Sequence, residues 1–347
     1  MGAKTVTLRN ILDADRRIRG IVNRTPAYHS MTFSKIVGAD VFMKLECFHP
    51  IGVFKIRGAA NKICSLSQTE LKKGLICASS GNHGLAVSYV SKICGAKATI
   101  IVPTNAVEEK VIAIRNYGAE VIKFGNDYDE AHAKALKIQG ETRATFVHPF
   151  NDVLVIAGQG TVGLELLRKT PDLDAIIVPI GGGGLISGIS VAAKSLNPNI
   201  KIIGVQPERS SAVYQSWKAG KIVELNSIRT AADGLAARKP LELTFELIKK
   251  HVDNILLVTE QEIGEAVLAF LNQAHILAEP SGAASLAALF KYQPKPKEKI
   301  AIIVSGANIS VDYLTTLLNR RALMNPRFPN EPTVSAVARS DWFAPKF

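Results

Sequence analysis

One lysine stands out in residues 44–59 because apolar residues flank it. Lys55 lies between Phe54 and Ile56, and Arg57 follows two positions later. Burial and a nearby cation would both lower the pKa of the amine and make it a better nucleophile. A single lysine more often extends its charge into water. This segment alone therefore leaves both a reactive and a solvent-exposed lysine open.

A small polar loop, SSGNHG at residues 79–84, follows an apolar run at residues 75–78. The apolar stretch at residues 85–90 is suited to a helix. Backbone amides at a helix N-terminus bind carboxylates and phosphates. Ordinary strand-to-helix loops also favour Gly, Ser and Asn. The loop is thus compatible with an anion site or with a plain connection.

A run of four glycines forms a second candidate loop: Gly181, Gly182, Gly183 and Gly184. Each would cost roughly 0.5–1 kcal/mol relative to alanine in a helix or strand, so the run indicates backbone wrapped closely around a phosphate. It lacks the lysine of a P-loop and the spacing of the dinucleotide fingerprint. The literal G-x-G-x-x-G at residues 158–163 follows no clear strand, and we interpret it as a chance match.

The elements that must position these loops alternate between strand and helix. Ser67-x-x-Glu70 and Thr259-x-x-Glu262 predict capping boxes that open helices. Several apolar runs are rich in Ile and Val, as expected for parallel strands covered on both faces. The pattern predicts an α/β fold with crossover helices. The predicted strands are residues 41–45, 75–78, 98–102, 120–124, 175–179, 200–205, 255–258 and 299–305.

Composition limits the class of protein. The 347 residues, 47% of them hydrophobic, are enough for about two domains. No C-x-x-C spacing occurs among the four cysteines, which argues against a disulfide framework or a structural zinc site. No leader segment is apparent, and we expect a cytoplasmic protein with reduced thiols. The apolar residues 175–193 contain Pro179 and the glycine run, so we expect no membrane span. The cysteines are Cys47, Cys64, Cys77 and Cys94.

The net charge of +12 invites a nucleic-acid partner. However, the lysines and arginines are dispersed and no recognition motif accompanies them, so we predict no nucleic-acid partner. A basic solvated surface or attraction of small anions explains the charge equally well. Residues 322–347 carry four prolines and no helical period. Their composition leaves a disordered tail and a docking segment both open.

Together, the three segments resemble the fold type II family of pyridoxal-phosphate enzymes, most closely the serine/threonine dehydratases and serine racemases. The resemblance extends from about residue 11 to residue 318. It implies a fold like that of the tryptophan synthase β subunit, with two open, twisted, mostly parallel-sheet domains. The large domain would comprise residues 1–74 and 151–321, and the small inserted domain residues 75–150. Further motifs in family order are HPF (148–150), AGQGT (157–161), GVQPE (204–208), DGLA (233–236), EPSGA (279–283) and SGAN (305–308).

The resemblance also implies roles around pyridoxal phosphate. Lys55 would hold the cofactor covalently and take the Cα proton of the substrate. Phe54 would pack beside the cofactor, Asn82 would bond its phenolic oxygen, and the amides of Gly181–Gly184 would hold its phosphate. Ser305 would meet the pyridine nitrogen. A serine cannot supply the negative charge that holds a pyridinium, so the ring would be a weaker electron sink, which favours β-elimination.

The polar loop would bind the carboxylate of the substrate. Ser80 also occupies the position that family racemases use as the acid on the opposite face. We therefore count Ser80 with Lys55 as catalytic candidates. The implied substrate-binding residues are Ser79, Ser80, Gly81, Asn82 and His83.

Three positions depart from the family pattern. Val53 replaces the usual Ser before Phe-Lys, and Leu85 replaces a frequent Gln. Metal-dependent members carry acidic ligands after the Gly-Val strand, where this chain has Gln206 and no carboxylate at residues 210–212. Glu279 alone is a thin ligand set for Mg²⁺ or Ca²⁺, so we predict no tight metal site.

The resemblance predicts a pyridoxal-phosphate-dependent threonine/serine ammonia-lyase, a lyase of amino-acid metabolism. It would act on a small amino acid as a homodimer or homotetramer. A serine racemase with side elimination is the main alternative. A β-replacement enzyme of the cysteine synthase type and a catalytically silent binding module are the others. The presence of Lys55, Asn82 and Ser305 argues against the silent module.

Overall fold

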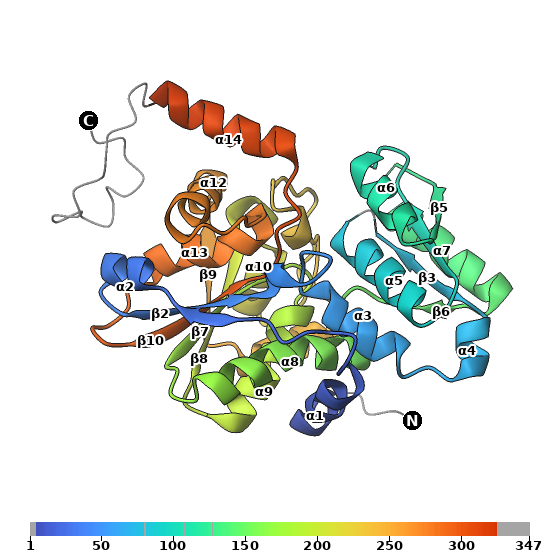
Figure 1. Cartoon of the computed structure of the whole chain (residues 1–347), viewed down its shortest axis with the longest axis horizontal. Helices are drawn as coiled ribbons and strands as arrows, with labels where there is room; N and C mark the ends of the chain where they lie inside the picture. The colour runs from blue at the N-terminus through green and yellow to red at the C-terminus, as the bar shows by residue number, and fades with distance from the viewer. Residues whose placement is uncertain (1–4, 80, 107, 127, 325–347) are drawn as a thin grey trace.

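The computed structural model describes residues 5–79, 81–106, 108–126 and 128–324. They form two separate β-sheets with helices packed around each (Figure 1). None of the described helices is long and apolar enough to cross a membrane. The predicted α/β class is confirmed, and the parallel strands are covered by helices.

The larger sheet has six strands in the order β1-β2-β10-β7-β8-β9. Strand β1 pairs antiparallel with β2, and all the other pairs are parallel. All residues of β7 are buried, as a parallel strand covered on both faces requires. The strands are β1 Ala27–His29, β2 Asp40–Leu45, β7 Ala175–Pro179, β8 Lys201–Pro207, β9 Asn254–Val258 and β10 Lys299–Val304.

The smaller sheet has four parallel strands in the order β5-β4-β3-β6. Its strands all lie between β2 and β7 in the chain, so the chain leaves the larger sheet, builds the smaller one and returns. In Figure 1 this sheet and its helices lie to the right of the larger sheet. The strands are β3 Leu75–Ala78, β4 Ala98–Val102, β5 Glu120–Lys123 and β6 Thr145–Phe146.

Helices occupy most of the connections. The predicted capping boxes at Ser67 and Thr259 are confirmed, since each side chain accepts from the amide of its Glu partner. The helices are α1 Leu8–Arg17, α2 Met31–Val37, α3 Lys55–Ile63, α4 Gln68–Lys72, α5 Asn82–Ile93, α6 Glu108–Asn116, α7 Tyr128–Thr142, α8 Val153–Lys169, α9 Gly184–Leu196, α10 Ala212–Ala219, α11 Glu242–His251, α12 Glu260–Ala269, α13 Pro280–Tyr292 and α14 Val311–Met324. Four short helical turns are η1 Glu46–Phe48, η2 Glu208–Ser210, η3 Asp233–Leu235 and η4 Phe270–Ala274.

The eight predicted strands are all present, with ends shifted by a residue or two. Strands β1 and β6 were not predicted, because they have three and two residues and are too short to show a period. The G-x-G-x-x-G at residues 158–163 lies inside α8, so it is not a phosphate-binding loop between strand and helix. Of the predicted tail, residues 325–347 lie outside the described residues.

Helix α3 joins the two halves of the molecule. Its residues Ile56 and Ala59 belong to the apolar cluster that also contains the buried face of β3 and β4. On its other side α3 packs closely on α8, where a Cβ added to Gly158 would lie 2.5 Å from the carbonyl oxygen of Arg57. Glycine is therefore needed at residue 158 for this helix pair to approach so closely.

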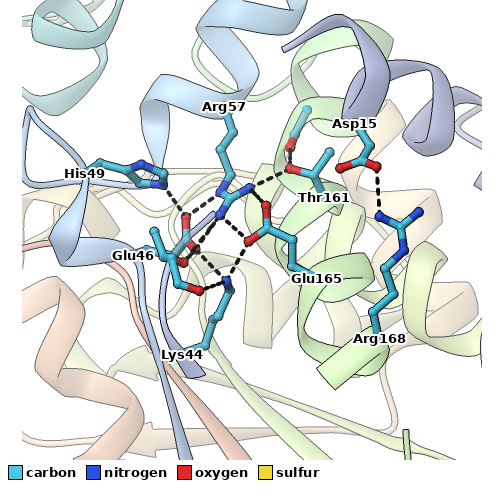
Figure 2. Close-up of polar contacts among 10 residues, drawn as sticks. Asp15, Lys44, Glu46, His49, Arg57, Thr161, Glu165 and Arg168 are labelled. Carbon is cyan, nitrogen blue, oxygen red and sulfur yellow. Dashed lines mark hydrogen bonds and ion pairs between the residues drawn. The ribbon is translucent and has the colours of Figure 1, made fainter. Parts of the chain in front are cut away.

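A buried cluster of charged side chains holds the first turn of α3 (Figure 2). The guanidinium of Arg57 donates to both carboxylate oxygens of Glu46 at 2.6 and 2.9 Å, and to both of Glu165 at 2.7 and 2.9 Å. None of the three side chains is more than 8% exposed. Buried charges are tolerated when they are paired and hydrogen-bonded, and this bidentate geometry meets that condition.

Two further residues complete this charge cluster. Lys44, at 1% exposure, lies 2.7 Å from Glu165 and donates to the Thr25 carbonyl at 2.8 Å. His49 contacts Glu46 at 3.0 Å. Although burial alone would raise the pKa of Glu46, Arg57, His49 and Lys44 together hold it well below its ordinary value. Two strongly basic groups thus face two carboxylates, and the cluster ties the end of β2 to α3 and α8.

Replacing Arg57 with Met should destabilise the fold by roughly 3–5 kcal/mol, because it leaves two buried carboxylates facing one lysine. Urea unfolding followed by circular dichroism measures this loss. The control is Arg168→Met, which breaks the 2.8 Å pair with Asp15 at a position where the arginine is 43% exposed. This control should cost about 1 kcal/mol or less. Equal losses in the two variants would contradict the importance given to the buried cluster.

Candidate active site

Lys55 is the first residue of α3, and Phe54 is its N-cap. The Lys55 amine donates to the Pro149 carbonyl at 2.9 Å and lies 5.3 Å from the centre of the Phe54 ring. No ion pair within the described part of the chain includes Lys55. Its amine is thus held by a single neutral acceptor.

Burial lowers the pKa of the Lys55 amine to about 8, and the nearby charge of Glu279 opposes part of that change. The expectation that Arg57 contributes to this shift is wrong. The guanidinium turns toward Glu46 and Glu165, whose charges compensate it. Desolvation is therefore the cause of the low pKa, and a substantial neutral fraction of the amine exists near pH 8.

The segment before Lys55 runs beside the end of β10. Val53 pairs with Gly306 in an antiparallel bridge, and the Phe54 amide donates to the Ser305 carbonyl at 3.0 Å. Ser305 is 2% exposed. The structure thus brings Phe54, Lys55 and Ser305 together. Val53 is fully buried in the apolar cluster of the smaller sheet, so this departure from the family pattern fills core volume.

Asn82 begins α5 and reaches across to the larger sheet. Its Nδ2 donates to Glu279 at 2.8 Å, and its Oδ1 accepts from Asn308 at 2.8 Å. Asn308 also donates to the Ile51 carbonyl at 3.0 Å. These bonds fix the orientation of the Asn82 amide. Because Nδ2 carries two hydrogens, one N–H remains to donate to another acceptor.

Glu279 supplies the carboxylate that accepts from Asn82. It is 3% exposed and precedes α13. Burial raises its pKa to about 7, the charge of Asp233 adds to that, and the bond from Asn82 opposes it. A Cβ on Gly306 would lie 2.4 Å from the Glu279 carboxylate, so this close approach requires glycine.

The polar loop lies between β3 and α5. The Gly81 amide donates to the Ser79 hydroxyl at 3.3 Å. His83 contacts the Val147 carbonyl at 2.8 Å, and burial lowers its pKa to about 3, so its ring is neutral near pH 7. The Nε2 atom of the imidazole is thus engaged within the fold. Ser80 lies outside the described residues.

The glycine loop leads from β7 into α9. Gly183, at φ +94°, is the N-cap of α9 and supplies no side-chain acceptor to the first amides. A Cβ on Gly182 would lie 2.5 Å from the Phe150 ring, and one on Gly181 would lie 2.5 Å from the Gly234 carbonyl. The loop therefore presents only backbone atoms at a helix N-terminus. It lies beside Phe150, the residue next to Pro149 in the chain. Such a loop suits a phosphate.

The position expected to lack a metal ligand has a structural role. Gln206 donates to the Ile180 carbonyl at 3.2 Å and accepts from the Tyr214 amide at 2.8 Å. Within the described ranges, no group of three or more His, Cys, Asp or Glu residues could hold a metal ion. Metal independence stays a prediction.

Three residues that contact the candidate site had no predicted role in it. They are Pro149, whose carbonyl accepts from Lys55, and the Asn82 partners Glu279 and Asn308. The signal was present in the motifs HPF, EPSGA and SGAN, which contain them. However, a motif does not say which atom faces which partner.

A family model described as "Pyridoxal-phosphate dependent enzyme" matches residues 18–306. The chain belongs to this family of pyridoxal-phosphate-dependent enzymes. It is 45% identical to an L-threonine ammonia-lyase of Thermotoga maritima over 93% of this chain and 80% of the relative. It is 41% identical to a serine racemase of Oryza sativa subsp. indica over 90% of this chain and 94% of the relative.

A solved structure of maize serine racemase superposes with a TM-score of 0.87 at 38% identity, covering 93% of this chain and all of that chain. The predicted fold type II architecture is thereby confirmed.

The described residues fit the cofactor of this family. Lys55 is half-buried and offers an amine with no ionic partner, as covalent attachment of an aldehyde requires. The glycine loop offers backbone donors at a helix N-terminus for the phosphate. Asn82 retains one N–H that can donate to an oxygen acceptor. The buried Ser305 carries a neutral hydroxyl and not a carboxylate.

Glu279→Gln should reduce the loss of stability between pH 5 and pH 8. The folded pKa of Glu279 is about 7 against an ordinary 4.5. As the pH rises through this window, the Glu279 carboxyl ionises in the unfolded state before it ionises in the folded state. The free energy of unfolding of the wild type therefore falls by up to about 3 kcal/mol and becomes constant above pH 7. Glutamine does not ionise, so the variant lacks this pH dependence. Thermal unfolding of cofactor-free protein at the two pH values measures it.

The control for this pH experiment is Glu246→Gln, at an exposed position on α11. It should retain the pH dependence of the wild type. An unchanged pH dependence in Glu279→Gln would contradict the raised pKa.

Proposed function

We propose that the protein is a threonine/serine ammonia-lyase, which converts a small hydroxy amino acid to a 2-keto acid and ammonia. The observation that carries the proposal is the Lys55 amine, which has a pKa of about 8 and a neutral carbonyl as its partner. A base of that pKa is suited to removing a Cα proton near neutral pH. The names of relatives such as the L-threonine ammonia-lyase of Thermotoga maritima support the reaction class.

Pyridoxal phosphate supplies the electron sink that acidifies the Cα–H bond of a bound amino acid. We assign Lys55 to hold the cofactor and to take the Cα proton. Phe54 packs beside the cofactor and Asn82 donates its remaining N–H to the phenolic oxygen. Ser305 meets the ring nitrogen. The neutral Ser305 leaves that nitrogen without a compensating anion, which favours early loss of the β-hydroxyl.

The two loops bind the anionic ends of the reacting molecules. We assign the backbone amides of Gly181–Gly184 to the cofactor phosphate. We assign the loop between β3 and α5 to the substrate carboxylate, through Ser79, Ser80, Gly81, Asn82 and the backbone of His83. The Asn82 amide, oriented by Glu279 and Asn308, then links the substrate loop to the cofactor.

Lys55→Ala should abolish 2-keto acid release from L-threonine and L-serine, with a loss of at least roughly 10³-fold, because the amine both holds the cofactor and moves the proton. A coupled dehydrogenase assay that reduces the keto acid measures the rate.

The control is Lys72→Ala, which removes an exposed lysine on α4 and should leave the rate unchanged. Equal rates in Lys55→Ala and the wild type would contradict the role of Lys55. No keto acid from the cofactor-loaded wild type with either substrate would contradict the lyase assignment itself.

A serine racemase activity is the second candidate, because serine racemases are among the relatives at 41% identity. We propose that Ser80 serves as the acid on the face opposite Lys55. Ser80→Ala should then lower D-serine formation from L-serine at least roughly 10²-fold, the usual worth of a positioned acid, and retain most keto acid release. Chiral chromatography measures the D-serine. A parallel loss of both products would contradict an acid role specific to racemisation.

We also propose a cytoplasmic homodimer or homotetramer with the two-domain division at residues 75–150. The four free thiols support a reducing compartment. Exposed apolar side chains, including Met31 at 80% and Phe48 at 56%, support a subunit interface. The four strands of the smaller sheet, all within residues 75–146, support the division.

A further inference from the structure

Two cysteines that are far apart in the sequence meet at the ends of two helices. Cys64 is the C-cap of α3 and Cys94 is the C-cap of α5. Their sulfur atoms are 3.7 Å apart, although 30 residues separate them. Both residues are half-buried. Nothing in the proposed lyase reaction uses this pair.

The other two cysteines provide the contrast. Cys47 and Cys77 are buried, and burial raises the pKa of both thiols, that of Cys47 to about 12. The hydrogen bond between Cys64 and Cys94 instead lowers the pKa of Cys94 to about 7, and the same bond raises the pKa of Cys64. Thiolate is the nucleophilic form, so reactivity is concentrated at Cys94.

The geometry permits a covalent bond with little movement. A disulfide has an S–S length of about 2.05 Å, so the sulfur atoms need to approach by about 1.7 Å. Both residues lie just beyond the last turn of their helices, where the backbone has fewer hydrogen bonds to break. The two helices already pack in one apolar cluster, which contains Ala59 of α3 and Val90 of α5.

We propose that Cys64 and Cys94 form a reversible thiol–disulfide site that reacts with an anionic low-molecular-weight disulfide of the glutathione type. The positive charge of Arg17 acts on Cys64, and a cation at this place also attracts a carboxylate-bearing reagent. The partner thiol lies close enough to resolve the adduct. The site belongs to this chain alone and requires no second subunit.

The reaction balances in two exchanges. The Cys94 thiolate attacks one sulfur of the small disulfide, forms a mixed disulfide and releases one small thiolate. The Cys64 thiolate then attacks the Cys94 sulfur and displaces the second small thiolate. The two protein thiols lose two protons and two electrons in total. The small disulfide is reduced to two thiols.

The cross-link joins the helices that begin at Lys55 and Asn82. It closes a loop of about 30 residues in the unfolded chain, which restricts the unfolded ensemble and stabilises the folded protein. Oxidation should therefore raise the midpoint of thermal unfolding, and reduction with dithiothreitol should restore the original value.

The test treats the cofactor-loaded protein with glutathione disulfide and analyses it by mass spectrometry with peptide mapping. We expect a mass loss of two hydrogens, a peptide pair linked through Cys64 and Cys94, and reversal by dithiothreitol. Cys47 and Cys77 should stay unmodified and serve as internal controls. The thermal midpoint of the same sample should be higher than that of the reduced protein.

Single variants separate the two steps. Cys64→Ser retains a hydroxyl donor beside Cys94 and should accumulate one glutathione on Cys94. Cys94→Ser should react at least tenfold more slowly. Stable glutathione on both cysteines of the wild type, or no reaction at either, would overturn the proposal. A lower thermal midpoint after cross-linking would overturn the claim that the helices are already placed for the bond.

Discussion

The position of α3 depends on the buried pairing of Arg57 with Glu46 and Glu165. Arg57 follows Lys55 by two residues, so the contacts that hold its guanidinium also hold the turn that presents the lysine. Because the guanidinium is fully compensated, it does not act on the lysine amine, whose pKa falls through burial. Arg57 thus anchors the first turn of α3, and Lys55 in the same turn has no ionic partner.

The candidate site forms where the two sheets meet, and Asn82 is the link between them. It starts a helix of the smaller sheet, while its partners Glu279 and Asn308 belong to segments around the larger sheet. A buried carboxyl with a pKa of about 7 orients this amide. The parallel topology explains why the other loops of the site lie together, since loops at the carboxyl ends of neighbouring strands converge and ligands bind there.

Local patterns were enough to predict every strand except β1 and β6, because runs such as AIIVP at β7 carry a buried-strand signature within a few residues. Local patterns also made the glycine loop and Lys55 candidates, but only the resemblance to a known family gave them roles. The pairing of Arg57 with Glu165, 108 residues apart, could not, since a sequence does not reveal which ions meet in the core. The two-residue strand β6 and the 3.7 Å approach of Cys64 to Cys94 likewise arise only from tertiary packing.

The central claim is that Lys55 is the residue that holds pyridoxal phosphate. The most direct measurement loads the protein with the cofactor, reduces it with borohydride so that the attachment becomes permanent, and maps the modified peptide by mass spectrometry. The account predicts the added mass on Lys55 alone, since its amine has a pKa of about 8 and lacks an ionic partner. Modification of another lysine with Lys55 unmodified, or no permanent attachment in protein that binds the cofactor, would contradict it.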